Sequence, residues 1–240
     1  MSYQTLLKYG LQWFVAISLW AVTIASSAAE QGPGVKGSQA DTPAATRSAV
    51  IYKPPLLDAP RTRVDGGAGD TGSEAASLQV LAPDHAGLTT QVQPTLYWYA
   101  RTPVAVRFEF VRIDEAGVVP LLEVKAGSDK VAGIQQLNLG DHNISLQPEL
   151  AYQWSVAPVM DEDSRSTAVI ERMKPGEGLT SRIEKSRGMD LVGVYAIEGI
   201  WYDALETISS MIDKSPEDQG LVAIRASLLD QVGLQSVTGN

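Results

Sequence analysis

The sequence predicts an α+β fold, in which an antiparallel β-sandwich precedes a short C-terminal α-helical hairpin. Between residues 77 and 175, apolar and polar side chains alternate in several short runs, and turn residues separate these runs. Short strands at regular spacing, without helical patterns between them, are typical of a β-sandwich. From Thr180 the apolar residues recur at helical spacing instead, which predicts helices over residues 180–234.

Residues 1–29 have the composition of a secretory signal peptide. An apolar run over residues 11–25 is followed by small residues at 26–29, which is the order that precedes signal cleavage. The alternative is an uncleaved membrane anchor, but a span needs roughly 20 apolar residues and this run is shorter. We therefore expect cleavage after Ala28 or Ala29. The mature protein would then be exported to the periplasm or the extracellular space, without membrane insertion.

Two segments of unusual composition follow the signal. Residues 30–50 contain almost no large apolar side chains, which predicts a disordered linker. Residues 51–76 are rich in Pro and Gly and are expected to be extended, with Tyr52, Pro54 and Pro55 as candidate partner-binding residues. The start of this segment either lies along an edge of its own sandwich or is presented to another protein. We favour the first arrangement, because the apolar side chains would otherwise be exposed together.

The sandwich domain is expected over residues 77–175. Strands are predicted at Pro94–Ala100, Val104–Val111, Val118–Val124, Gly133–Leu139, Ala151–Val156 and Thr167–Met173.

Aromatic residues on the first of these strands form a second candidate site. Leu96 and Trp98 point to one face of the strand, and Tyr97 and Tyr99 point to the other. If Trp98 lies in the core, the two tyrosines lie on the outer face, where they could stack on sugars or anchor a protein partner. We favour the other arrangement, in which the C-terminal helices cover this face, because they need a surface to pack on.

The helical region is expected over residues 180–234. Its first strong apolar stripe runs from Trp201 to Ile212, and a helix start follows at Ser215–Asp218. The next helix ends near Gly233, and a further helix is expected near Leu191–Glu198. The two C-terminal helices should pack antiparallel as a hairpin.

Composition excludes several classes of function. The formal net charge of −9 argues against non-specific binding to nucleic acid and to anionic membranes. The chain has no Cys, which excludes disulfides, thiol nucleophiles and Cys-based zinc sites.

The remaining polar clusters predict no catalytic, cofactor or metal site. His85 and His142 each follow an Asp beside turn residues, which favours a role in loops over metal binding. The acidic run Asp161–Asp163 lacks a calcium-loop pattern, and we expect a solvated turn in which Arg165 pairs with one acid. Gly66–Gly69 lacks the residues of a phosphate-binding loop.

Two tracts resemble general architectures. Pro83–Trp98 and Tyr152–Val156 resemble fibronectin type III or immunoglobulin-like sandwiches of exported bacterial proteins. Tyr195–Leu205, with Pro216 after it, is similar to one tetratricopeptide-like repeat. Both architectures are generally used for binding.

A more specific resemblance covers most of the chain. The tracts that carry it are Tyr52-Lys53-Pro54-Pro55, Leu88-Thr89-Thr90, Gln93 to Tyr99, Asp163 to Ser166, Gly199 to Leu205 and Leu228 to Leu234. Over Tyr52 to Leu234 the chain resembles the exported bacterial family called domain of unknown function nine-two-eight. This resemblance implies an exported protein and no established activity.

Together these observations favour a non-catalytic exported adaptor or accessory protein that binds another envelope protein. The alternative is a carbohydrate-binding module of the cell envelope that uses Tyr97 and Tyr99. A third possibility is a hydrolase without a recognisable motif, since paired carboxylates can be far apart in sequence.

Overall fold

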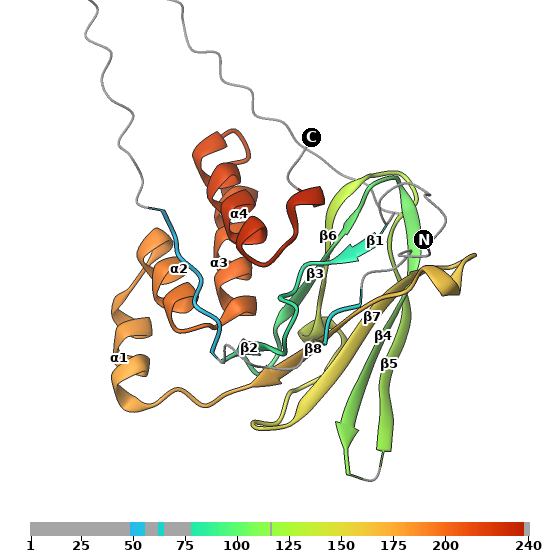
Figure 1. Cartoon of the computed structure of the whole chain (residues 1–240), viewed down its shortest axis with the longest axis horizontal. Helices are drawn as coiled ribbons and strands as arrows, with labels where there is room; N and C mark the ends of the chain where they lie inside the picture. The colour runs from blue at the N-terminus through green and yellow to red at the C-terminus, as the bar shows by residue number, and fades with distance from the viewer. Residues whose placement is uncertain (1–48, 56–61, 65–77, 116, 238–240) are drawn as a thin grey trace, which may run out of the picture. The chain divides into compact units, whose positions relative to one another are not determined.

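The computed structural model describes residues 49–55, 62–64, 78–115 and 117–237, which form two β-sheets and a group of helices (Figure 1). The smaller sheet has the strand order β1-β3-β6, with β1 at Leu78–Val80, β3 at Thr95–Ala100 and β6 at Gly133–Asn138. The larger sheet has the order β2-β8-β7-β4-β5. Its strands are β2 at Gly87–Thr89, β8 at Ser166–Arg172, β7 at Ala151–Pro158, β4 at Val104–Asp114 and β5 at Gly117–Ser128.

The six strands from β3 to β8 lie near the predicted positions, whereas the short strands β1 and β2 were not predicted. One pairing also differs from the expected arrangement. β2 pairs with β8 in parallel, with Gly87 opposite Ile170, so the larger sheet is mixed and not wholly antiparallel. A period of two determines which side chains share a face, and it is the same for both directions of pairing. The direction of this short strand therefore could not be read from the sequence.

Aromatic side chains fill the space between the two sheets. Trp98 of the smaller sheet lies 6.3 Å, centroid to centroid, from Phe108 of the larger sheet, and Phe108 stacks on Trp154 at 6.0 Å. Phe110 and Tyr152 stack on neighbouring strands at 5.5 Å. All five are buried, which confirms that Trp98 points into the core of the sandwich.

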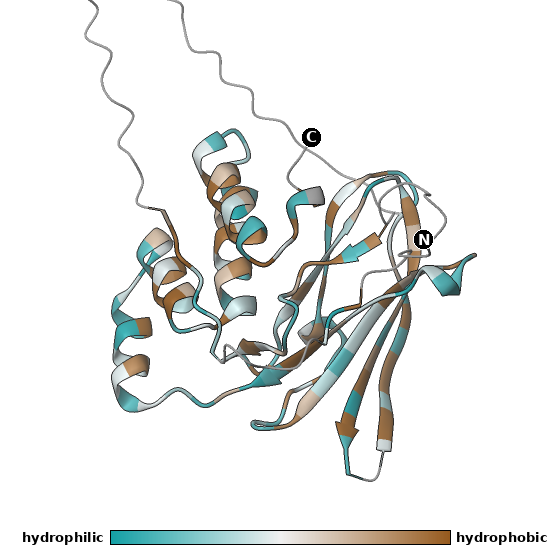
Figure 2. Ribbon diagram, in the orientation of Figure 1, coloured by the Kyte–Doolittle hydropathy of each residue, from teal (hydrophilic) through white to brown (hydrophobic). Residues whose placement is uncertain are grey.

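Four α-helices follow the strands in the described part of the chain: α1 at Glu177–Lys185, α2 at Gly188–Ile197, α3 at Trp201–Lys214 and α4 at Gln219–Gln231. The predicted hairpin corresponds to α3 and α4, and the further helix expected near Leu191–Glu198 corresponds to α2. Of these four helices, only α1 was not predicted. In α1 only Leu179 and Ile183 are large apolar residues, which are too few to give a clear helical period in the sequence. Figure 2 shows α1 as more hydrophilic than α2. No helix in the described ranges is long and apolar enough to cross a membrane.

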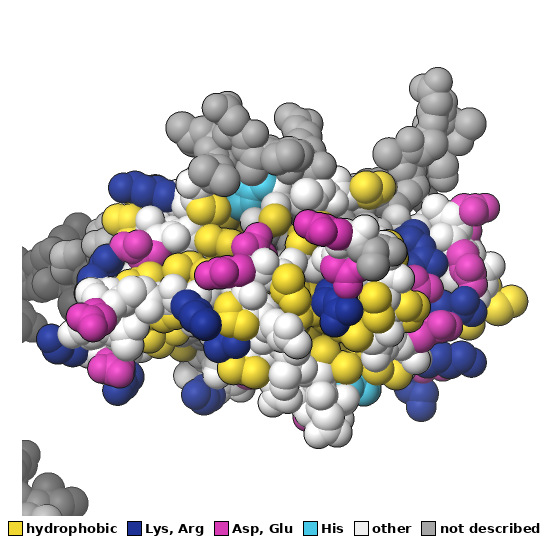
Figure 3. Space-filling model, turned by 90° about the horizontal axis from the view of Figure 1, so that it is seen from below, with side chains coloured by type: hydrophobic (Ala, Val, Ile, Leu, Met, Phe, Trp, Pro, Cys, Tyr) yellow, Lys and Arg dark blue, Asp and Glu magenta, His cyan; other side chains and the backbone are white. Residues whose placement is uncertain are grey.

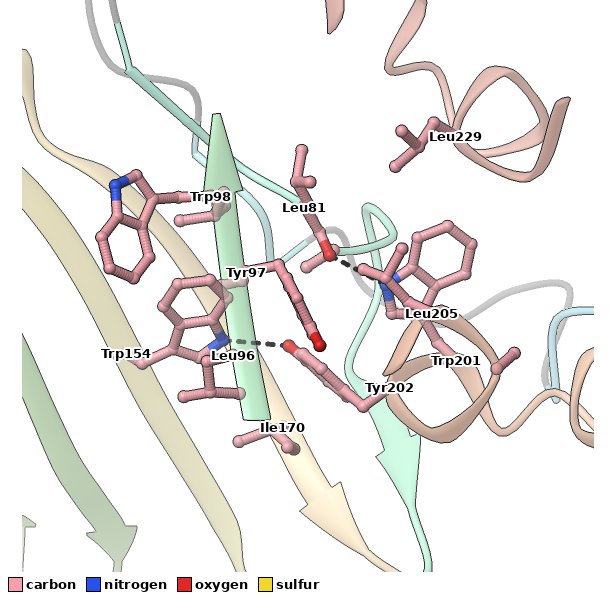
Figure 4. Close-up of a cluster of buried hydrophobic side chains, with 14 of the residues drawn as sticks. Leu81, Leu96, Tyr97, Trp98, Trp154, Ile170, Trp201, Tyr202, Leu205 and Leu229 are labelled. Carbon is pink, nitrogen blue, oxygen red and sulfur yellow. Dashed lines mark hydrogen bonds between the residues drawn. The ribbon is translucent and has the colours of Figure 1, made fainter. Parts of the chain in front are cut away.

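The first two residues of α3 attach the helices to the sandwich (Figure 4). Both side chains are buried. The indole N–H of Trp201 donates to the backbone carbonyl of Leu81 at 2.9 Å. The hydroxyl of Tyr202 donates to the carbonyl of Val169 at 3.2 Å and accepts from the indole N–H of Trp154 at 2.9 Å. The helical layer is therefore joined by directed bonds to the chain just after β1, to β8 and to the buried Trp154 of β7.

The third residue of α3, Asp203, is a buried carboxylate that holds the chain just after β2. It accepts hydrogen bonds from the hydroxyls of Thr89 and Thr90, and from the backbone N–H of Thr90 at 3.0 Å. Burial, and to a smaller extent the carboxylate of Glu206, raise the pKa of Asp203 to about 6, although these hydrogen bonds act in the opposite direction. Glu206 accepts from the hydroxyl of Thr95 at 2.7 Å, so carboxylates on one helical turn bind both ends of the β2–β3 connection.

The buried indole of Trp201 predicts a large loss of stability on truncation. Trp201→Ala should lower the free energy of unfolding by ~3–5 kcal/mol, because it leaves a cavity and an unpaired carbonyl at Leu81. The check is the midpoint of urea unfolding, with Val118→Ala at an exposed position on β5 as the control. A Trp201→Ala midpoint equal to that of the control would contradict this account.

The raised pKa of Asp203 predicts a pH-dependent contribution to stability. At pH values between the usual carboxyl pKa of about 4 and the folded value, the folded protein holds a proton that the unfolded chain releases. This contribution favours folding at low pH and is lost as the pH rises through about 6. Asp203→Asn removes it, so the stability of the wild type relative to this variant should fall by roughly 2–3 kcal/mol from about pH 4 to about pH 7. Urea unfolding across this range measures the difference, and a constant difference would show that Asp203 does not titrate there.

Candidate functional site

The segment Ala49–Pro55 lies on the helices of its own chain, beside α2 in Figure 1. The side-chain amide of Gln231, at the end of α4, accepts from the backbone N–H of Tyr52 at 2.8 Å and donates to the carbonyl of Val50 at 3.0 Å. The backbone N–H of Lys53 donates to the carbonyl of Ala196 at 3.0 Å. A side-chain amide that binds one peptide N–H and one nearby C=O holds an extended chain by its backbone.

This placement changes two sequence-based expectations. The start of the segment packs on the helices and not on an edge of the sandwich. A later part of the predicted extended segment 51–76 does reach the sandwich, because Val64 exchanges two backbone hydrogen bonds with Thr167, at 3.0 and 2.8 Å. Val50, which the sequence analysis places in the linker, is only 8% exposed. The predicted signal and residues 30–48 lie outside the described residues.

Tyr52 is the side chain that anchors the segment. It is buried, and its ring meets the ring of Trp201 edge-on with centroids 5.1 Å apart. Its hydroxyl lies 3.4 Å from Nε2 of His85. Burial raises the pKa of Tyr52, as do Tyr202 and Asp84, so the phenol stays protonated. Tyr52 is thus part of the protein's own core and is not free to contact a partner, whereas Pro54 and Pro55 remain exposed.

Gly199, between α2 and α3, allows the segment to approach. Its φ is 72°, and a Cβ at this position would lie 2.7 Å from the carbonyl oxygen of Lys53 and 3.0 Å from Cδ of Pro55. Both the backbone angle and the space therefore require glycine here.

An open groove of about 870 Å³ runs beside the docked segment, and we call it the segment groove. Its lining comes from the segment (Ala49, Val50 and Ile51), from α1 and the residue after it (Arg182 and Ser186), and from α2 (Met189, Asp190, Gly193, Val194 and Ile197). Two large apolar side chains of the lining are exposed, Ile51 by 62% and Ile197 by 43%. Arg182 is paired with Glu198, whereas Asp190 has no hydrogen-bond or ion-pair partner among the described residues.

Tyr97 and Tyr99, the other candidate aromatic residues, lie on the face of the smaller sheet opposite Trp98. Tyr97 is only 4% exposed. It lines a cavity together with side chains of α3 and α4, among them Ser209 and Arg225. Tyr99 is half-buried and pairs across the sheet with Ile134. The helices therefore cover Tyr97, which offers no exposed ring for stacking on a sugar.

The polar clusters singled out in the sequence do not come together. No group of three or more His, Asp or Glu side chains in the described ranges could hold a metal ion. His85 contacts Tyr52, and His142 ends a short 3-10 helix. Arg165 forms a two-bond pair with Glu109 of β4 instead of an acid of the 161–163 turn, and Glu162 pairs with Arg107 at 2.6 Å.

The close approach at Gly199 predicts that a methyl group there loosens the segment. Gly199→Ala should destabilise the docked state by about 1–2 kcal/mol through backbone strain and the contact with Lys53. Chymotrypsin should then cleave after Tyr52 about 5–30 times faster than in the wild type.

The matched control is Gly178→Ala in α1, where a Cβ would meet nothing within 4 Å. Cleavage after Tyr52 that is equally fast in the wild type and in both variants would show that the segment is not held on the helices.

Comparison with known proteins places the chain in one family. No curated protein matches it. A family model described as Domain of Unknown Function (DUF928) matches residues 59–240, so the tract Tyr52–Pro55 lies outside the matched range. The resemblances to fibronectin type III or immunoglobulin-like domains and to a tetratricopeptide-like repeat stay predictions. Since the match covers most of its length, the chain belongs to the Domain of Unknown Function (DUF928) family.

Proposed function

We propose that this protein is an exported, non-catalytic adaptor or accessory protein that binds another envelope protein at the segment groove. The observation that carries the proposal is the groove itself, an open hollow with Ile51 and Ile197 exposed at its lining. Contiguous exposed apolar surface with a polar rim is typical of protein-interaction sites. The docked segment forms one wall, so the site exists only while the segment is held on the helices.

The lining also indicates the chemistry of the partner. Its apolar part suits aliphatic or aromatic side chains, and the exposed carboxylate of Asp190 has no partner among the described residues. A partner segment that presents an apolar side chain next to a Lys or Arg would satisfy both features. Elsewhere on the surface, the face in Figure 3 carries positive, negative and hydrophobic side chains interspersed, so charge of one sign does not dominate that face.

A charge placed in the groove should abolish partner binding without unfolding the protein. A photo-crosslinking residue at Ile197 in cells that export the protein identifies the partner, and purified components then give the affinity. We expect Ile197→Arg and Ile51→Arg each to weaken binding at least about tenfold. We expect Asp190→Asn to weaken it less, and most strongly at low salt.

The matched control is Val118→Arg, which adds the same charge at a position that is 64% exposed on β5. Unchanged affinity in both groove variants would contradict the proposal. Retention of the wild type and the groove variants alike on cell-wall polysaccharide would favour the carbohydrate-binding alternative.

A further inference from the structure

A second cavity, of about 330 Å³, lies between the smaller sheet and the last two helices. We call it the Tyr97 cavity. Its lining is Tyr97 of β3, residues Ile134, Gln135 and Gln136 of β6, Ser209, Ile212 and Asp213 of α3, and Arg225 of α4. It shares no residue with the segment groove, so it is independent of the proposed partner site.

A buried hydroxyl in this cavity makes no well-formed hydrogen bond. Ser209 is 2% exposed, and its Oγ makes no hydrogen bond of ordinary geometry, although the phenol of Tyr97 is nearby. A buried polar group without a partner is unfavourable and uncommon in folded proteins. A polar ligand atom in the cavity would satisfy it.

Two opposite charges face the same cavity without pairing. Arg225 is half-buried and Asp213 is exposed, and neither forms an ion pair or a hydrogen bond with another described residue. They are close enough to interact: burial lowers the pKa of Arg225, while Asp213 and Tyr97 act in the opposite direction. A guanidinium and a carboxylate held in this way can bind the two charges of one small molecule.

The neutral groups of the lining complete the set of donors and acceptors. Burial raises the pKa of Tyr97, and Glu206 and Asp213 raise it further, so its phenol remains a hydrogen-bond donor. The side chains of Gln135 and Gln136 carry both donors and acceptors. The volume is at the low end for ligand pockets, which restricts the ligand to a small molecule.

We propose that the Tyr97 cavity binds a small zwitterion of the α-amino acid class. The carboxylate of the ligand binds Arg225 with the hydroxyls of Tyr97 and Ser209, and its ammonium group binds Asp213. Ile134 and Ile212 provide apolar contact for a short side chain. The proposal concerns binding only and involves no chemical step.

Calorimetric titration of the purified mature protein tests the proposal. The probes are L-alanine, L-glutamine and L-glutamate, with L-alaninamide, propionate and glucose as matched compounds that lack the carboxylate, the ammonium group or both. We expect at least one amino acid to bind and to raise the melting temperature. Arg225→Gln and Asp213→Asn should each weaken that binding at least about tenfold, and Ser209→Ala should weaken it less.

Arg187→Gln, at an exposed arginine next to α2, is the control and should bind like the wild type. The absence of binding by all three amino acids would overturn the proposal. It would also be overturned if alaninamide and propionate bound as well as alanine, if glucose alone bound, or if binding survived both charge-removing variants. Circular dichroism of each variant verifies the fold, so a loss of binding is read only from folded protein.

Discussion

The arrangement of this protein depends on how the first turn of α3 enters the sandwich. Trp201, Tyr202 and Asp203 are consecutive, and successive helical residues point about 100° apart. Each side chain therefore reaches a different part of the sandwich: the carbonyl of Leu81, the core at Trp154, and the chain after β2. Because all are buried and directed, rotation or sliding of the helix would leave several polar groups unpaired at once.

The position of α3 determines the two candidate sites. Trp201 provides the ring against which Tyr52 packs, so it holds the segment that forms one wall of the segment groove. Farther along the same helix, Ser209 and Asp213 line the Tyr97 cavity. Both sites are thus consequences of one helix docking on one sandwich, although they lie in different places and share no residue.

The buried polar groups between α3 and the sandwich fix the orientation of the helix more than they stabilise the folded protein. A carboxylate such as Asp203 loses its hydration on burial and recovers only part of that free energy from hydrogen bonds, which is the physical reason for its raised pKa. An apolar contact would tolerate several orientations of the helix, since hydrophobic attraction has no direction. The hydrogen-bonded contact tolerates one, and that precision allows cavities of defined lining to persist between the layers.

The sequence by itself determined the α+β class, the positions of most strands, the helices from α2 onward and the family. Alternation, helical spacing and turn residues are local signals, and in β4 the burial of Val106, Phe108 and Phe110 shows the alternation directly. It did not determine the parallel pairing of β2 or the place of Tyr52. The apolar pattern of a three-residue strand is the same for parallel and antiparallel pairing. The sequence also cannot distinguish an apolar residue that binds a partner from one that packs on the protein's own helices.

The candidate sites needed the tertiary structure for the same reason. No sequence motif singles out Arg225, Asp213 and Ser209, which are polar residues of two helices. The sequence alone left open whether Tyr97 and Tyr99 are exposed or covered by those helices. Only the packing of α3 and α4 over β3 and β6 brings these residues around one cavity and covers the ring of Tyr97. Burial and the pairing of charges are properties of residues distant in the chain that meet in space, so no local pattern in the sequence specifies them.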